Sequence, residues 1–125
     1  MTSQHRPHRH RFPLEHLERR IDEILEQRCR FEHMAAPLQT WAEKWSTGTL
    51  ERWLHLDNLP LEERERALIA LALQATEEAG AVIDAYSPGG RGEAHKVLYG
   101  VVKLEWEQRH RARGDGHLKR RSRIA

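Results

Sequence analysis

The sequence predicts an all-α protein: a small bundle of three long helices and two short helices that carry tryptophans, with disordered basic ends. Apolar residues recur every three or four positions along most of the chain, which is the period of an α-helix. Proline-leucine pairs stand where helices are expected to begin, and no strand-like alternation is evident. The 125 residues fit one domain, expected over 13–113 between an N-terminal tail (1–12) and a C-terminal tail (114–125).

Composition excludes several classes of protein. The longest apolar run, Ala67 to Leu73, has seven residues, whereas a membrane-spanning helix needs about 20. No apolar stretch follows the basic N-terminus, so neither a membrane location nor export by a signal peptide is expected. Cys29 is the single cysteine, which excludes an internal disulfide and a cysteine-based zinc cluster. We therefore expect a cytoplasmic protein.

The first helix is expected from about Pro13 to Met34, because proline suits the first helical position. Arg28 interrupts its apolar pattern, so a long coiled coil is not expected. Cys29 borders the apolar face, which predicts a buried, inert thiol. Two alternatives stay open for this face: it packs inside the domain, or it packs against a second copy of the chain. The face is a heptad seam formed by Leu14, Leu17, Ile21, Ile24 and Phe31.

Two short helices are expected next, at about 37–44 and 49–56, with a break at Thr47-Gly48. Trp41, Trp45 and Trp53 fall in this region and are expected to dominate its packing.

A central helix is expected from Pro60 to about Tyr86, since its middle is apolar on nearly all sides. The glycine-rich segment 87–92 is the clearest loop in the sequence. The last helix is expected from Glu93 to about Arg113, with Gly114 and Gly116 ending it.

Charge is unevenly distributed along the chain. Residues 14–108 carry 11 basic and 18 acidic residues, whereas residues 1–13 have a net charge of +3 and residues 109–125 a net charge of +6. Basic ends of this kind suit contact with a polyanion such as DNA or RNA. An arginine-rich coding bias, with ends that only keep the chain in solution, is the rival explanation. The candidate nucleic-acid-binding residues are Arg91, Lys96, Lys103, Arg109, Arg111, Arg113, Lys119, Arg120, Arg121 and Arg123.

One stretch resembles a known DNA-binding region. Leu59-Pro60-Leu61-Glu62-Glu63-Arg64-Glu65 opens a helix, Thr76-Glu77-Glu78-Ala79 follows, and a basic helix comes last. This order resembles the C-terminal DNA-binding region of bacterial sigma factors. The resemblance covers residues 59–113 and implies DNA contacts from Arg91, His95, Lys96 and Lys103. The loop is longer than a helix-turn-helix turn, and no break is expected before Thr76.

A second stretch offers carboxylates. Glu77, Glu78, Asp84 and Glu93 flank the loop, and facing acidic helices can hold Mg²⁺. Residues 77–82 are similar to the first acidic helix of the all-helical nucleotide pyrophosphohydrolases, but Gly100 and Lys103 stand where that family has its second acidic pair. We expect a solvated acidic face here, and neither a metal nor a cofactor.

The preferred hypothesis is therefore a non-enzymatic helical binding protein, a regulator or accessory factor that contacts DNA or RNA through its basic ends. The alternative is a protein-interaction or assembly module that forms a homodimer or docks a protein partner through the first helix. A degenerate metal-dependent nucleotide hydrolase is the third possibility.

Overall fold

The computed structural model describes the backbone of residues 5–124 and the side chains of residues 14–114. Within that range the chain forms five helices and no strand, so the all-α prediction is confirmed. Of the tails predicted to be disordered (1–12 and 114–125), residues 1–4 and 125 and the side chains of residues 5–12 and 115–124 lie outside the described part. The helices are α1 (His5–Ala42), α2 (Thr47–Leu54), α3 (Leu61–Gln74), α4 (Glu77–Ala85) and α5 (Glu93–Ile124).

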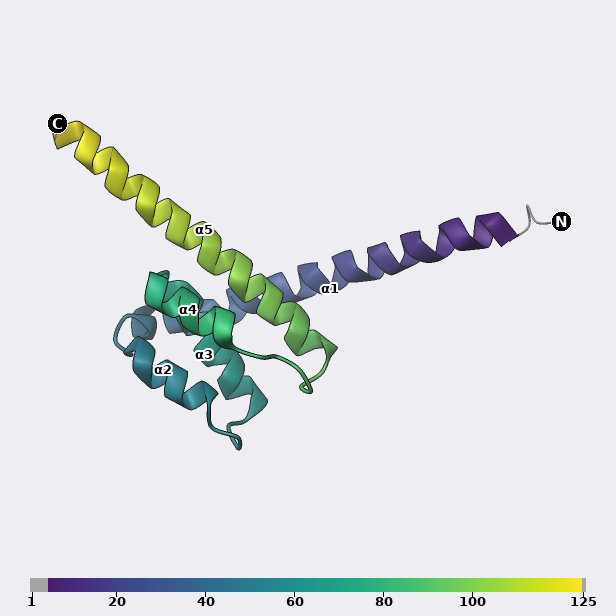
Figure 1. The fold of residues 1–125 in the computed structure, drawn as a ribbon, viewed down its shortest axis with the longest axis horizontal. Helices are drawn as coiled ribbons and strands as arrows, with labels where there is room; N and C mark the ends of the chain where they lie inside the picture. Colours follow the sequence, from purple (N-terminus) through teal and green to yellow (C-terminus); the bar gives the residue numbers. More distant parts are fainter. Residues whose placement is uncertain (1–4, 125) are drawn as a thin grey trace.

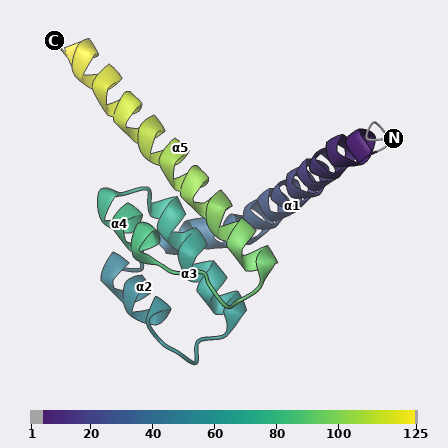
Figure 2. The same cartoon turned by 45° about the vertical axis from the view of Figure 1, so that its right-hand side comes forward.

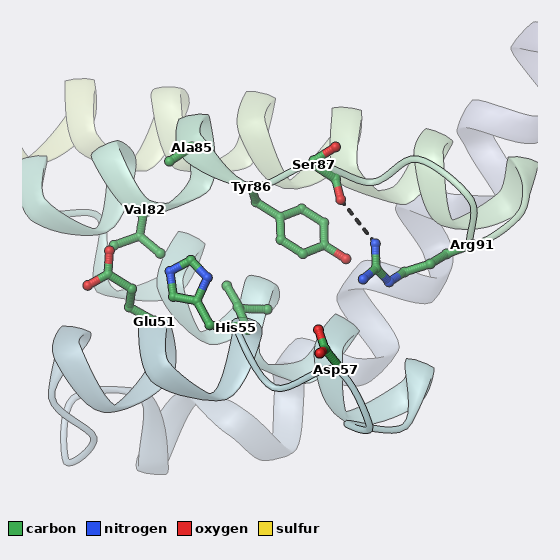
Figure 3. Close-up of a pocket in the computed structure, with 9 residues that line it drawn as sticks. Glu51, His55, Asp57, Val82, Ala85, Tyr86, Ser87 and Arg91 are labelled. Atoms are coloured by element: carbon green, nitrogen blue, oxygen red, sulfur yellow. Dashed lines mark hydrogen bonds between the residues drawn. The ribbon is translucent and has the colours of Figure 1, made fainter.

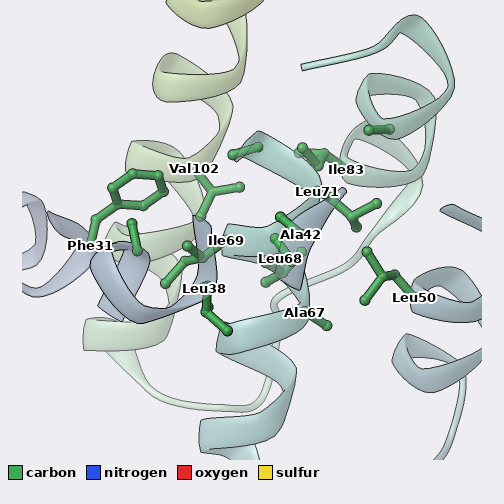
Figure 4. Packing of buried hydrophobic residues seen from close by; sticks show 14 of the residues in the cluster. Phe31, Leu38, Ala42, Leu50, Ala67, Leu68, Ile69, Leu71, Ile83 and Val102 are labelled. Carbon is green, nitrogen blue, oxygen red and sulfur yellow. The ribbon is translucent and has the colours of Figure 1, made fainter. Parts of the chain in front are cut away.

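Helix α3 lies at the centre of the fold, because its residues 67–72 are apolar on every side and are all buried. Helices α1, α2, α4 and α5 all pack against it. Burial of large aliphatic side chains such as Leu68 and Leu71 contributes about 1.5–3 kcal/mol each. Figure 4 shows this core, to which the other helices contribute Phe31, Leu38, Leu50, Ile83 and Val102.

Helix α1 passes through two prolines that were expected to open helices. Pro13 and Pro37 both lie inside α1, so the predicted helices 13–34 and 37–44 form one element. A proline inside a helix costs about 3 kcal/mol because it removes a hydrogen bond and its ring crowds the preceding turn. The buried face of α1 outweighs this cost, since Phe31, Ala35 and Leu38 keep one helical register across Pro37.

The tryptophan region is less buried than expected. Trp41 is 52% exposed and Trp53 38% exposed. Trp45 packs against the core and meets Trp53 edge-on at 5.7 Å. The turn between α1 and α2 ends at Ser46. The Ser46 side chain accepts a hydrogen bond from the Thr49 amide and so caps the N-terminus of α2. The two short helices are therefore α2 and α4, not a pair around the tryptophans.

The predicted central helix is divided in two. Ala75 has a left-handed backbone (φ 54°) and ends α3. The Thr76 side chain then accepts a hydrogen bond from the Ala79 amide and begins α4, as threonine does at many helix starts. The expectation of an unbroken helix from Pro60 to Tyr86 is therefore wrong, and Thr76 is the signal that it overlooked.

Both long helices leave the packed body. Figures 1 and 2 show the N-terminal half of α1 and the C-terminal half of α5 projecting from it in different directions. Helix α5 continues to Ile124, past Gly114 and Gly116. Glycine weakens a helix by about 1 kcal/mol but keeps its backbone donor, so the two glycines do not end α5.

Polar side chains of α3 close the ends of its neighbours. The last carbonyls of a helix have no partner within it. Gln74 donates to the carbonyl of Ala42, the last residue of α1, at 2.9 Å and to that of Trp45 just beyond it at 2.7 Å. Arg64, which is 2% exposed, donates to the carbonyls of Leu54 and Leu56 at the end of α2. These contacts fix where α1 and α2 stop relative to α3.

Candidate functional site

The basic residues proposed for nucleic-acid contact are largely engaged within the protein. Arg111 bonds Glu107 at 2.9 Å, and Arg109 lies 3.5 Å from Glu105. Arg113 donates to the Gln74 carbonyl at the end of α3. In this part of α5, each of these arginines therefore pairs with a carboxylate of the same helix or donates to a backbone carbonyl of α3.

The remaining candidates are scattered. Arg91 donates to the Ser87 and Gly89 carbonyls of its own loop, and Lys103 lies 3.8 Å from Asp84. Lys96 is exposed on α5. The side chains of Lys119, Arg120, Arg121 and Arg123 lie outside the described residues. Among side chains 14–114, every one of these candidates except Lys96 thus contacts another group of the protein.

Two observations oppose the sigma-factor resemblance and one supports it. His95, which it implies as a DNA contact, is 1% exposed and has no surface to offer. The break at Ala75-Thr76 does supply the division between two helices that the resemblance requires. The loop between Ala85 and Glu93 remains too long for a tight helix-turn-helix turn.

The projecting half of α1 carries an apolar face that nothing in the described structure covers. We call Leu14, Leu17, Ile21 and Ile24 the α1 face; these side chains are 60, 54, 54 and 39% exposed. The same helical stripe continues through Phe31, Ala35 and Leu38, which the body buries. The heptad seam is therefore buried inside the domain from Phe31 onward and exposed from Leu14 to Ile24. Packing inside the domain accounts for only the first of these two parts.

A groove adjoins the α1 face where α1 meets α5. It has a volume of about 300 Å³. Gly100 gives it a shallow floor, since a Cβ built there has no atom within 4 Å. Leu104 on the same side of α5 is 54% exposed. The apolar residues that line the groove are Ile24, Val97, Gly100, Val101 and Leu104.

A buried polar network surrounds Glu65 of α3. Glu65 and His95 are each 1% exposed. Glu65 accepts two hydrogen bonds from Arg30 of α1 and lies 3.1 Å from His95 Nδ1. Since a carboxylate only accepts, the Nδ1 proton points to Glu65; in the neutral ring Nε2 then accepts from the Tyr86 hydroxyl at 2.7 Å. The network links α1, α3 and α5 with the residue that follows α4.

Tyr86 also borders a cavity of about 250 Å³ between α2, the end of α4 and the loop. Figure 3 shows Arg91 extending from the loop towards Tyr86 and bonded to the Ser87 carbonyl, with Asp57 and His55 on the α2 side. Burial raises the pKa of the Tyr86 hydroxyl above its ordinary value. The Tyr86 hydroxyl therefore stays protonated to a higher pH than an ordinary tyrosine and can donate its hydrogen bond to His95 Nε2.

Metal-binding geometry is absent from the part of the chain that the structure describes. No three His, Cys, Asp or Glu side chains gather there in a way that could hold an ion. Glu77 and Glu78 are exposed in the first turn of α4, and Asp84 faces Lys103. Cys29 is exposed rather than buried as expected, because only the stripe through Phe31 faces the body.

Sequence reasoning missed the buried polar residues of α3. Arg64 and Glu65 come one turn before a run that is apolar on all sides, and that position was the available signal for their burial.

No described helix is long and apolar enough to cross a membrane.

Comparison with known proteins adds no relative to this picture. No family model, no curated protein and no solved structure matches the chain.

Proposed function

We propose that the protein is a self-associating assembly module whose interface is the α1 face. One observation carries the proposal: a stripe that the body buries at Phe31 and Leu38 continues, uncovered, over Ile24, Ile21 and Leu14. A soluble chain rarely leaves a row of large aliphatic side chains exposed on successive turns unless a partner covers them.

The energetics of a lone helix favour the same conclusion. An isolated helix in water is marginal at about 12–15 residues even for favourable sequences, and the projecting part of α1 carries Pro7 and Pro13. Complete burial of a Leu or Ile contributes about 1.5–3 kcal/mol. The α1 side chains are about half exposed, so covering each contributes about 1 kcal/mol, and a homodimer would cover two sets at once.

Light scattering across a concentration series tests the proposal. The wild-type chain is expected to form a defined dimer, and Ile21→Lys is expected to weaken association at least ~100-fold, since two charges would enter one apolar interface. His16→Lys adds a lysine to the same helix outside the α1 face, and it should leave the dimer unchanged. A chain that stays monomeric throughout, or equal effects of the two lysines, contradicts the proposal.

A second candidate function keeps the basic C-terminal end. We infer that α5 serves as a basic arm for DNA or RNA, because its last residues project from the body (Figure 1) and four bases fall between Lys119 and Arg123. Retention of a short duplex should fall steeply as salt rises and should be lost on removal of residues 114–125. Binding that survives this truncation, or that does not respond to salt, contradicts the arm.

A further inference from the structure

We propose that the α5 arm, residues 114–124, binds duplex DNA as a helix that lies in the major groove, with a phosphate strand on each side of it. This inference rests on the proposed role of α5 as a basic arm. It adds the form of nucleic acid, the groove and the conformation in which the arm binds.

The α5 arm carries its positive charge away from an acidic body. Arg113 still contacts the body, since it donates to the Gln74 carbonyl of α3. Beyond Arg113 the helix continues and projects from the body (Figure 1). Lys119 and Arg123 therefore lie about 9 and 15 Å further along the axis, at a rise of about 1.5 Å per residue. Charges this far apart are largely screened at physiological salt, where the screening length is about 8 Å. The 18 acidic residues of 14–108 thus oppose a polyanion on the arm only weakly.

The size of a helix favours one groove of one nucleic acid. An α-helix with its side chains is about 10–12 Å across. The major groove of B-DNA is about 12 Å wide, whereas its minor groove is only about 6 Å wide. The major groove of duplex RNA is deep and too narrow for side chains to enter. A basic arm that stays helical therefore fits the major groove of duplex DNA better than duplex RNA.

The composition of the α5 arm disfavours a single strand as its partner. Proteins that hold single strands stack the bases on aromatic side chains, but no Phe, Tyr or Trp occurs between residues 107 and 125. The arm instead has four bases against one acid, Asp115. Lys and Arg bind phosphate oxygens, so this composition suits contact with the backbone of a duplex.

Basic positions are spread around the axis of the α5 arm. Successive positions of an α-helix are turned by about 100°, so Lys119, Arg120 and Arg121 occupy positions that span about 200° of the circumference. Arg123 falls within the same span. A flat anionic surface would meet only one side of such a helix. A helix in the major groove has a phosphate strand along each side, so bases over a wide arc can all find phosphates.

Two substitutions at one uncharged position test whether the arm binds as a helix. Leu118→Ala keeps a good helix former, whereas Leu118→Pro removes a helical hydrogen bond and separates residues 118–124 from the rest of α5. So short a segment does not stay helical by itself. Fluorescence anisotropy with a labelled DNA duplex of mixed sequence measures the affinity of each full-length variant at one salt concentration.

Leu118→Ala should bind the duplex within about two-fold of the wild-type affinity, and Leu118→Pro at least ~10-fold more weakly, because proline breaks the helix and leaves the charge unchanged. Circular dichroism and urea unfolding establish that the body of each variant remains folded. Equal affinities of the two variants overturn binding as a helix and leave the basic arm standing.

Three nucleic acids of equal length test the groove with the wild-type chain. Duplex DNA should bind at least ~10-fold more tightly than duplex RNA or single-stranded DNA, because only its major groove admits a helix. The logarithm of its binding constant should fall with the logarithm of salt concentration with a slope of about −4, one phosphate for each base of the arm. Equal or tighter binding of duplex RNA or of the single strand overturns the major-groove assignment alone. Absence of salt-dependent binding to all three overturns the basic arm as well.

Discussion

Gly80 of α4 lies directly against the indole of Trp106. A Cβ at this position would stand 2.2 Å from Trp106 Cζ2 and 2.6 Å from Cε2. Gly80→Ala would therefore displace an indole whose Nε1 donates to the Thr76 carbonyl at 2.8 Å. We expect a loss of about 3 kcal/mol in the free energy of unfolding, from crowding together with the lost hydrogen bond, measured by urea unfolding.

Gly48 of α2 provides the matched control, because it is also helical and has no atom within 4 Å of its built Cβ. Gly48→Ala should leave stability unchanged or raise it by up to about 1 kcal/mol. Equal effects of the two substitutions would contradict the close approach of Trp106 to Gly80.

Tyr86 and Tyr99 give the stability a pH dependence above neutrality. Burial is the main cause that raises the pKa of each hydroxyl above the ordinary value of 10.0. The folded state thus holds these protons more tightly than the unfolded state does. Their contribution is fully present below pH 10 and is lost as pH rises from there through the raised folded values.

The urea midpoint is accordingly expected to fall between pH 9 and pH 11, and to fall less in a Tyr86→Phe, Tyr99→Phe double variant. The double variant also loses hydrogen bonds to His95 and to the Ile83 carbonyl, so the slope with pH is the informative quantity. An unchanged slope would show that other groups cause the alkaline loss.

Individual buried polar residues were the hardest features to predict from sequence. Arg64 and Glu65 read as surface charges in an acidic, helix-opening segment, yet they are 2% and 1% exposed. Their partners are backbone carbonyls of α2 and side chains from α1 and α5. A helical pattern shows which face is apolar, but it does not show which distant groups will need a donor or an acceptor there.

At the scale of the helices, the proline signal was right once in three uses. Pro60 stands at the N-cap of α3, one position before the expected first helical position, whereas Pro13 and Pro37 lie inside α1. Proline fits a first helical turn, but the sequence on either side of Pro37 keeps one buried face in register. Tertiary packing therefore decides whether the helix continues, and packing is not visible in a local motif.

Pro37→Ala tests this account of α1. Restoring an amide donor and removing the ring from an exposed helical position should raise stability by about 2–3 kcal/mol, measured by urea unfolding. Pro60→Ala is the control, because at the N-cap proline removes no helical hydrogen bond and its replacement should give no such gain. No stabilisation by Pro37→Ala would mean that the two parts of α1 are not one helix.

Gln74→Leu tests whether hydrogen bonds from the Gln74 side chain of α3 stabilise the C-terminal end of α1. The side chain keeps a similar size but loses the amide that serves the Ala42 and Trp45 carbonyls. Leaving buried acceptors unpaired costs about 1–3 kcal/mol each, so we expect a loss of about 3 kcal/mol by thermal or urea unfolding. Gln39→Leu, at an exposed position of α1, should change stability little; a similar loss there would contradict the specific role of Gln74.

For the whole molecule, composition and periodicity predicted the fold class. They also predicted a heptad seam on the first helix that packs either inside the domain or against a second copy of the chain. The seam is buried from Phe31 onward and exposed up to Ile24. The sequence could not show where the change occurs, since the same heptad spacing runs through both halves. Its position is set by where α3 and α5 cross α1, which depends on the whole fold.

Removal of residues 1–25 tests whether the exposed part of the seam is needed for association and not for folding. Every buried apolar side chain of the core lies at Phe31 or later, so the shortened chain should still unfold cooperatively. Binding between folded copies raises apparent stability with concentration. The full chain should therefore melt at higher temperature as its concentration rises, whereas the shortened chain should melt at one temperature throughout, as calorimetry would show. A shortened chain that fails to fold would mean that the projecting half of α1 stabilises the body directly, and a concentration dependence that persists would place the interface elsewhere than on the α1 face.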